Sequence, residues 1–226
     1  MTPRLAVAKE VAPLVAKLTL CSRSCPSDLL VSIKDKNPSV QVTHEPLDVS
    51  QLHDVRRFTT KHEATQFDWI VLTPGLLSMN GRTETKEGLD VNMCTHYNGR
   101  CVFQVHAGSR YAGQTESPSV RVLNVLGAVQ GSPPDLNDLN LKRTFSIKRC
   151  AEATTMYSYV AFAERAPDAS FIHATPGFAM DEFTTGWHLI NQDAQEMPKT
   201  IYHTDELKDV VWKHALETID GVMTQH

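Results

Sequence analysis

The sequence lacks the features that mark a membrane-spanning or secreted protein. No apolar run reaches the roughly 18 residues that a membrane-spanning helix needs, and Met1 is followed by neither the apolar core nor the small-residue cleavage site of a secretory signal. Cysteine is scarce as well, because the 226 residues include only five. An odd number in a chain of this length argues against a disulfide framework and indicates a reducing compartment such as the cytoplasm.

The composition gives no support for metal or nucleic-acid binding. Cys21 and Cys25 are one close pair, and no second pair of cysteines or histidines completes a zinc site. The net charge of −4 gives no electrostatic reason to expect nucleic acid or an anionic membrane as a partner. The hydrophobic fraction of 41% is ordinary for a globular protein, so we expect one domain, residues 1–226, with a sizeable core.

What the sequence does contain is a regular alternation of short apolar runs and helical patterns. Strand-like runs lie at residues 17–21, 40–49, 69–73, 120–127 and 169–175, the last of them being the last clear strand; helical patterns lie at residues 5–15, 28–36, 50–62, 86–107, 145–166 and 205–219. Ser50 is a plausible N-cap for the third helix. Because the strands are apolar throughout, helices must cover both faces. This predicts an α/β fold with a doubly wound, mostly parallel sheet.

Two of the apolar runs end in the same three residues, Thr73-Pro74-Gly75 and Thr175-Pro176-Gly177. Doubly wound folds bind their ligands beyond the carboxyl ends of the strands. Glycine there lets a ligand approach the backbone closely, and proline fixes the turn. The same triplets are also common punctuation after a strand, and the sequence leaves both interpretations open.

Six stretches, in this order, carry a family resemblance: "LCSRS", "PLDVS", "FDWIVLTPGLLSMNGRTETKEGLDVN", "RVLNVLGA", "FSIKRCAEATTM" and "SFIHATPGFAM". Together they cover most of residues 5–185, and they resemble the short-chain dehydrogenase/reductase family, most of all its divergent fungal branch. The resemblance implies a Rossmann-like fold that binds NAD(P) along the carboxyl edge of its sheet. It also implies an oxidoreductase that acts on a carbonyl or alcohol in fungal secondary metabolism.

The resemblance assigns cofactor-binding residues to four strand ends. Ser22-Arg23 follows the second family strand, where a basic residue resembles the NADP-type pattern of a guanidinium paired with the 2′-phosphate. Asp48-Val49 matches the Asp-Val that meets the adenine, Thr73 and Gly75 lie where the family has Asn-Ala-Gly, and Pro176-Gly177 matches the Pro-Gly against the nicotinamide. On the residues alone, Arg23 could equally be a solvated loop arginine and Asp48 a helix cap.

Three departures from the family pattern put activity in doubt. The opening strand and Gly-rich turn, which would precede residues 5–15, are absent, so we expect an exposed strand edge and the loss of the main anion site. Phe145 and Arg149 replace the family's tyrosine and lysine, and Leu126-Gly127 replaces its serine. His96 stands about where the family carries a catalytic asparagine.

Three residues remain as candidates for acid–base chemistry. His96 can titrate near neutral pH and lies next to the expected cleft. Tyr97 is either a proton donor or a core residue on the face of Leu89 and Met93, and Arg149 offers charge and donors in a forked geometry. Tyr157 and Tyr159 lie too far along their helix to replace Phe145, and His173 is interpreted as a core residue.

Two functions therefore stay open. One is an NADP-preferring oxidoreductase with a small-molecule substrate. Residues 181–204 would be its substrate lid, in which Phe183, Trp187 and Met197 either line an apolar pocket or pack. The other is a non-redox descendant of the fold, that is, a pseudoenzyme, a binding module or a cyclase-like catalyst. Family members often assemble through their long helices, which makes a homo-oligomer through residues 86–107 and 145–166 possible.

The assignment of Arg23 can be tested directly. Arg23→Ala is expected to weaken NADPH binding far more than NADH binding, because only NADPH carries the 2′-phosphate. Fluorescence titration of both nucleotides measures the two losses. Equal losses would remove the argument for phosphate recognition.

Overall fold

The structure, a computed structural model, describes residues 3–25, 28–76, 78, 80–111, 120–126, 132–162, 170–174, 186–190, 195–198 and 201–225. The chain divides into two compact units, Met1–Asp48 and Val49–His226. None of the helices in the described ranges is both long and apolar enough to cross a membrane. Each unit is described by itself below.

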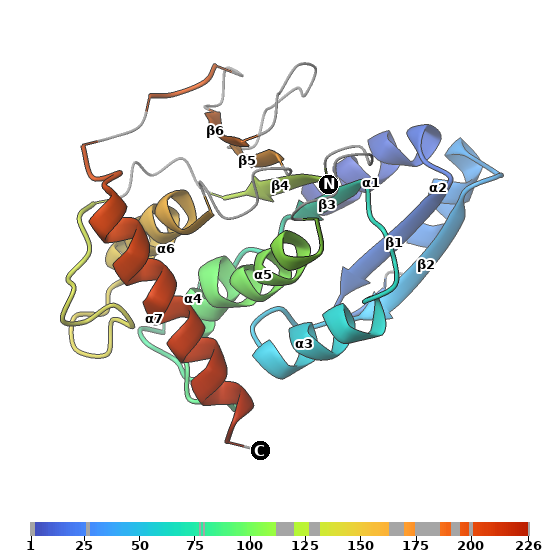
Figure 1. The fold of residues 1–226 in the computed structure, drawn as a ribbon. Coiled ribbons are helices and arrows are strands. Elements are labelled where there is room, and N and C mark those ends of the chain that lie inside the picture. The colour runs from blue at the N-terminus through green and yellow to red at the C-terminus, as the bar shows by residue number, and fades with distance from the viewer. Residues whose placement is uncertain are drawn as a thin grey trace. The chain divides into compact units, whose positions relative to one another are not determined.

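The first unit is a two-stranded parallel sheet with two helices (Figure 1). Its elements are α1 (Pro3–Val11) with the 3₁₀ turn η1 (Ala12–Leu14), β1 (Lys17–Ser22), α2 (Leu29–Lys36) and β2 (Gln41–Pro46). Lys17 lies opposite Gln41, and Ser22 lies opposite Pro46. Helix α2 ends before Asn37, which precedes a proline and takes an extended conformation (φ −144°, ψ 96°). The sequence predicted this helix end correctly.

The second unit contains a four-stranded parallel sheet in the order β3-β4-β5-β6. Its strands are β3 (Trp69–Leu72), β4 (Arg121–Val125), β5 (Ser170–Ala174) and β6 (Gly186–Ile190). The parallel α/β class is therefore confirmed. Among the described strands, β1 pairs only with β2, and β3 pairs only with β4.

Strand β6 was not expected. The sequence predicted that the strand at residues 169–175 is the last one, and it placed residues 186–190 inside a candidate lid. Because β6 follows β5, the prediction that no clear strand comes after residue 175 is wrong. The segment "GWHLI" has a histidine between its apolar residues, so it shows neither a continuous apolar run nor clean alternation. Its pairing with β5 makes it a strand, and this is a tertiary interaction that local propensity does not contain.

Helices cover the core of the second unit. They are α3 (Leu52–Lys61), α4 (Val91–Met93), the π-helical turn η2 (Cys94–Asn98), α5 (Gly99–Tyr111), α6 (Ile147–Phe162) and α7 (Asp205–Met223). The core joins the sheet to these helices and includes Leu72, Val120, Val122, Met93, Tyr97, Cys101, Met156, Tyr157, Val211 and Ala215. Figure 1 shows α7 (red) running across α6, with which it is in contact.

The predicted helix over residues 86–107 differs from the observed one at both ends. Helix α4 begins only at Val91, because the Asp90 side chain caps it by accepting the N–H groups of Asn92 and Met93 at 3.0 Å each. The residues before it form a tight hairpin, in which Glu84 pairs with Asp90 and Gly88 takes a φ of 74°. Helix α5 continues to Tyr111, so the observed helix ends four residues later than the predicted one.

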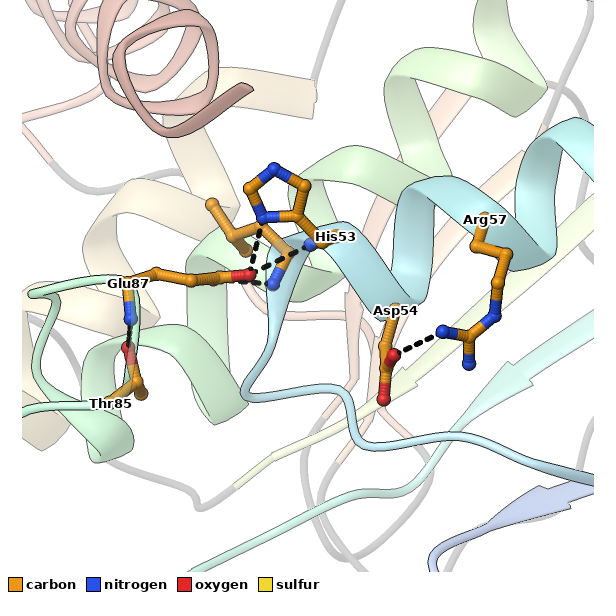
Figure 2. Close-up of polar contacts among 6 residues, drawn as sticks. His53, Asp54, Arg57, Thr85 and Glu87 are labelled. Atoms are coloured by element: carbon orange, nitrogen blue, oxygen red, sulfur yellow. Dashed lines mark hydrogen bonds and ion pairs between the residues drawn. The ribbon is translucent and has the colours of Figure 1, made fainter. Parts of the chain in front are cut away.

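Helix α3 is capped by a residue distant in sequence, not by Ser50. Gln51 occupies the N-cap position and makes no capping bond through its side chain, so the prediction for Ser50 is wrong. The buried carboxylate of Glu87 takes over this role (Figure 2). Its Oε2 accepts the N–H of Leu52 at 2.7 Å, and its Oε1 accepts the N–H of His53 at 2.9 Å. A carboxylate here also meets the positive end of the helix dipole.

We expect Glu87→Ala to lower the free energy of unfolding by about 1–3 kcal/mol, because two backbone N–H groups lose a charged acceptor. Urea denaturation measures the change. Glu217→Ala is the control, since that carboxylate is 63% exposed and forms only a surface pair with Lys213. A loss for Glu87→Ala no larger than the loss for Glu217→Ala would contradict the capping role.

Candidate functional site

The candidate site lies at the carboxyl ends of β3 and β4. The two strands are parallel, with Leu72 opposite Asn124, so their ends meet at one edge of the sheet. The turn Thr73-Pro74-Gly75 follows β3 directly, as the sequence predicted. Thr73 is half-buried and Gly75 is exposed. The second triplet follows β5, but Pro176 and Gly177 lie outside the described residues.

A single buried side chain, that of Arg100, binds both strand ends. Its Nη1 donates to the carbonyl oxygen of Leu72 at 3.3 Å, to that of Val125 at 3.1 Å and to the side-chain oxygen of Asn124 at 2.5 Å. Its Nη2 donates to the carbonyl oxygen of Pro74. The guanidinium therefore joins the last residues of two strands to the turn that follows the first of them.

Arg100 carries its charge without an anionic partner among the described residues. The side chain has no exposed surface, and each of its acceptors on Leu72, Pro74, Asn124 and Val125 is a neutral carbonyl or amide oxygen. Burial lowers its pKa to about 9, which still leaves the guanidinium charged at pH 7. A charge without a counter-ion in the interior is costly, so the oriented carbonyl dipoles must compensate for lost water.

The π-helical turn η2 places Arg100 and is itself packed closely. Arg100 Nε donates to the carbonyl oxygen of Thr95 inside this turn at 3.2 Å. The residue before Arg100, Gly99, admits no side chain, because a Cβ there would approach the carbonyl oxygen of Val49 to 2.0 Å. Val49, which the resemblance assigned to the cofactor, is thus a buried residue packed on this glycine.

His96 forms a hydrogen bond with the residue that follows the turn after β3, Leu76. Its Nε2 accepts the N–H of Leu76 at 3.1 Å. Burial and the positive charge of Arg100 lower the pKa of His96 to about 4, although the negative charge of Asp90 acts in the opposite direction. His96 is therefore neutral at pH 7, with its proton on Nδ1. Since Nε2 already accepts a hydrogen bond, the catalytic role assigned to His96 remains a prediction and would have to use Nδ1.

The other two catalytic candidates lie in different surroundings. Tyr97 is 1% exposed, and its ring meets that of Tyr157 edge-on at 5.2 Å, so burial raises the pKa of Tyr97 well above its usual value. Arg149 is exposed in the first turn of α6, where its Nη1 donates to the carbonyl oxygen of Thr144 at 3.4 Å. Phe145 is half-buried against the core and has no proton to give. The roles of Tyr97 and Arg149 also stay predictions.

Three of the predicted cofactor residues belong to the first unit. Ser22 is the last residue of β1, and its hydroxyl donates to the carbonyl oxygen of Ser24 at 2.7 Å and meets His44 Nε2 at 2.9 Å. Arg23 is exposed directly after this strand, and Asp48 is half-buried after β2. All three lie at strand ends, where the resemblance put them.

Arg100 was missed by the sequence reasoning, although the sequence contains a signal for it. It is the only lysine, arginine, aspartate or glutamate between Asp90 and Arg110. A lone charge in a helix predicted to cover a sheet is a candidate for a buried, fully bonded role. Asn92 differs from Arg100, because it is a buried residue (4% exposed) whose Nδ2 finds no hydrogen-bond partner among the described residues.

Comparison with known proteins adds relatives from fungi. No family model matches the chain. The chain is 30% identical over 162 residues to the NmrA-like family domain-containing oxidoreductase notO of Aspergillus sp. (strain MF297-2). It is 29% identical over 153 residues to an oxidoreductase of Emericella nidulans. Both matches cover 66% of this chain but only 46% and 45% of the relatives, so the chain spans about half the length of the curated relatives it matches.

Solved structures decide the fold. An uncharacterized protein from Mycobacterium paratuberculosis superposes with a TM-score of 0.72 at 14% identity, over 96% of this chain and 88% of that one. A metagenomic short-chain oxidoreductase in complex with NADP gives 0.54 at 14% identity, over 96% and 86%. The chain has the fold of the short-chain dehydrogenase/reductases.

This confirms the Rossmann-like fold that the resemblance implied. The NADH-dependent reductase A1-R′ in complex with NAD has the same fold, with a TM-score of 0.53 at 15% identity over 80% of this chain and 78% of that one. At such identities the likeness concerns the fold, and activity has to be argued from the site.

The state of His96 gives a prediction for acid stability. The histidine pKa is 6.5 when unperturbed and about 4 in the fold, so the unfolded chain binds this proton first as pH falls. The contribution of neutral His96 is complete above pH 6.5 and is lost progressively toward pH 4. We expect His96→Gln, which stays neutral and can still accept, to reduce the loss of unfolding free energy between these pH values by roughly 2–3 kcal/mol.

Urea denaturation at a series of pH values measures this effect, and the ring ¹⁵N shifts of His96 report its tautomer. The variant and the wild type differ in this one histidine, so the difference between their slopes reports on His96. Identical slopes for the variant and the wild type would contradict a neutral, hydrogen-bonded His96.

Proposed function

We propose that this chain is part of an NAD(P)-dependent oxidoreductase of the short-chain dehydrogenase/reductase type, acting on a carbonyl or alcohol. The observation that carries the proposal is the turn Thr73-Pro74-Gly75, held at the carboxyl ends of β3 and β4 by a buried cation. This is the sheet edge at which doubly wound folds bind nucleotides. Both curated fungal relatives are oxidoreductases, which supports the same reaction class.

The residues at this edge are compatible with a dinucleotide. Gly75 is exposed, and apart from Gly75 and its two chain neighbours no described residue has a heavy atom within 4 Å of the position that a Cβ would take there. The backbone is thus open to close approach. Thr73 and Gly75 would hold the cofactor, and Ser22, Arg23 and Asp48 are the further predicted contacts. A bound nicotinamide would supply or accept the hydride. Solved relatives of the same fold contain NAD and NADP.

The finer features of the proposal rest on the sequence. A preference for NADP follows from Arg23, and a role in fungal secondary metabolism follows from the resemblance to the fungal branch. A cytoplasmic location, a small-molecule substrate at a lid within residues 181–204 and a homo-oligomer are further predictions of the same kind.

A non-redox function is the second candidate, and the acid–base residues favour it. The aromatic ring at the position of the family tyrosine belongs to Phe145, and the Tyr97 hydroxyl keeps its proton because burial raises its pKa. His96 is neutral, with one ring nitrogen already accepting a hydrogen bond. No described residue of this edge therefore combines accessibility with a pKa near neutrality. A binding protein needs no accessible acid–base residue, and neither does a catalyst that only holds its substrate in a reactive conformation.

Titration of the purified chain with NADPH and NADH, followed by nucleotide fluorescence, tests the proposal. We expect saturable binding with a preference for NADPH. Gly75→Val should then weaken binding at least tenfold, because its side chain enters the open space above the turn. Absence of binding by a chain with intact circular dichroism would contradict the oxidoreductase and favour the second candidate.

Gly221→Ala is the matched control for Gly75→Val. Gly221 also has open space around its Cβ position but lies in α7. Neither glycine has a positive φ, so neither substitution strains the backbone. We expect Gly221→Ala to bind the nucleotide like the wild type. Equal binding by Gly75→Val would mean that the ligand does not lie over this turn.

A further inference from the structure

The residues on both sides of Gly75 are hydrogen-bonded to one helical segment, residues 94–100. On one side the carbonyl oxygen of Pro74 accepts from Arg100. On the other side the N–H of Leu76 donates to His96 Nε2 at 3.1 Å. Arg100 and His96 lie four residues apart across η2 and the start of α5. Gly75 itself points to open space, so a fixed backbone carries an exposed glycine.

The same guanidinium changes the charge of the sheet edge. Carbonyl groups at the carboxyl ends of parallel strands have no further strand partner and present negative partial charge to a ligand. Three of these groups, on Leu72, Pro74 and Val125, are instead bonded to Arg100. Since no described carboxylate pairs with Arg100, its positive charge is offset only by dipoles. An edge arranged in this way suits a ligand that carries negative charge.

An arginine is required for this arrangement. Its planar fork has five donors, and these bonds use Nε, Nη1 and Nη2 for four backbone carbonyl groups and one side chain. A lysine would bring the same charge with three donors on one atom, so it could not reach Thr95, Pro74 and Val125 together. Replacing Arg100 with lysine therefore keeps the positive charge but removes the forked set of donors, so an experiment can separate the two effects.

We propose that Arg100 is the positioning residue of the nucleotide site: it draws the carbonyl ends of β3 and β4 together, holds the Gly75 backbone in its binding conformation and makes this edge favourable for the anionic dinucleotide. The proposal rests on the proposed function for the identity of the ligand. We call the bonds from Arg100 to the carbonyl groups of Leu72, Pro74 and Val125 the Arg100 clamp, and this clamp rests only on the contacts of Arg100.

Amide hydrogen exchange tests the clamp without any nucleotide. In Arg100→Met the N–H of Leu76 should exchange at least tenfold faster than in the wild type, because the turn loses its attachment at Pro74. Arg100→Lys should show an intermediate change and serves where the methionine variant does not fold. Val211→Ala is the control, since it removes two buried methyl groups of α7 and none of the hydrogen-bonding groups of Arg100 or His96. We expect it to lower Tm without affecting Leu76. Unchanged exchange of Leu76 in a folded Arg100 variant would overturn the clamp.

Titration with NADPH tests the consequence for binding. We expect Arg100→Met to weaken the affinity at least tenfold and Arg100→Lys to weaken it less, while Val211→Ala stays within twofold of the wild type. Equal affinities of wild type and Arg100 variants would overturn the positioning role and leave the proposed function intact. If the wild type binds no dinucleotide while Leu76 still exchanges faster in Arg100→Met, the proposed function fails and the nucleotide role of Arg100 fails with it, but the clamp stands.

Discussion

The second unit depends on a cation in its interior that is bonded to the ends of two strands. Arg100 is fully buried and donates to carbonyl oxygens of Leu72, Pro74 and Val125. These contacts hold together the edge of the sheet at which a ligand is proposed to bind. They also explain the close packing around the arginine, because Gly99 must let the Val49 backbone approach and the π-helical turn must direct the side chain toward the sheet. Arg100 therefore has a structural role, and through its bonds it determines the geometry of the candidate site.

The chemistry of this site is limited by burial. The groups that could exchange protons are either inside the core, as Tyr97 is, or already hydrogen-bonded, as His96 is. The argument for binding is stronger than the argument for catalysis, since the turn after β3 is open, while the sequence resemblance puts Phe145 and Arg149 in place of the family's catalytic pair. The chain spans about half the length of its curated relatives. Binding is therefore the part of the function for which this chain gives the stronger argument.

Much of the fold was predictable because buried parallel strands are continuous apolar runs bounded by turn residues. Strands β3, β4 and β5 follow this rule, whereas the end of α2 was predictable from the proline that follows Asn37. Strand β6 does not, because its pattern is broken and its pairing with β5 defines it. The cap of α3 could not be predicted either, since Glu87 lies 35 residues from Leu52 and only the fold brings them together. The same holds for Arg100, whose acceptors lie 24 to 28 residues away on both strands.

The central claim is that the carboxyl ends of β3 and β4 form a nucleotide-binding edge organised by Arg100. Two-dimensional ¹H–¹⁵N spectra of the labelled chain during addition of NADPH test it most directly. The account predicts that the amide signals of Gly75, Leu76 and Leu126 shift in a saturable way, while those of the outer face of α7, such as Lys213 and Glu217, stay in place. Saturable shifts confined to residues outside this edge, or no shifts at all, would contradict it.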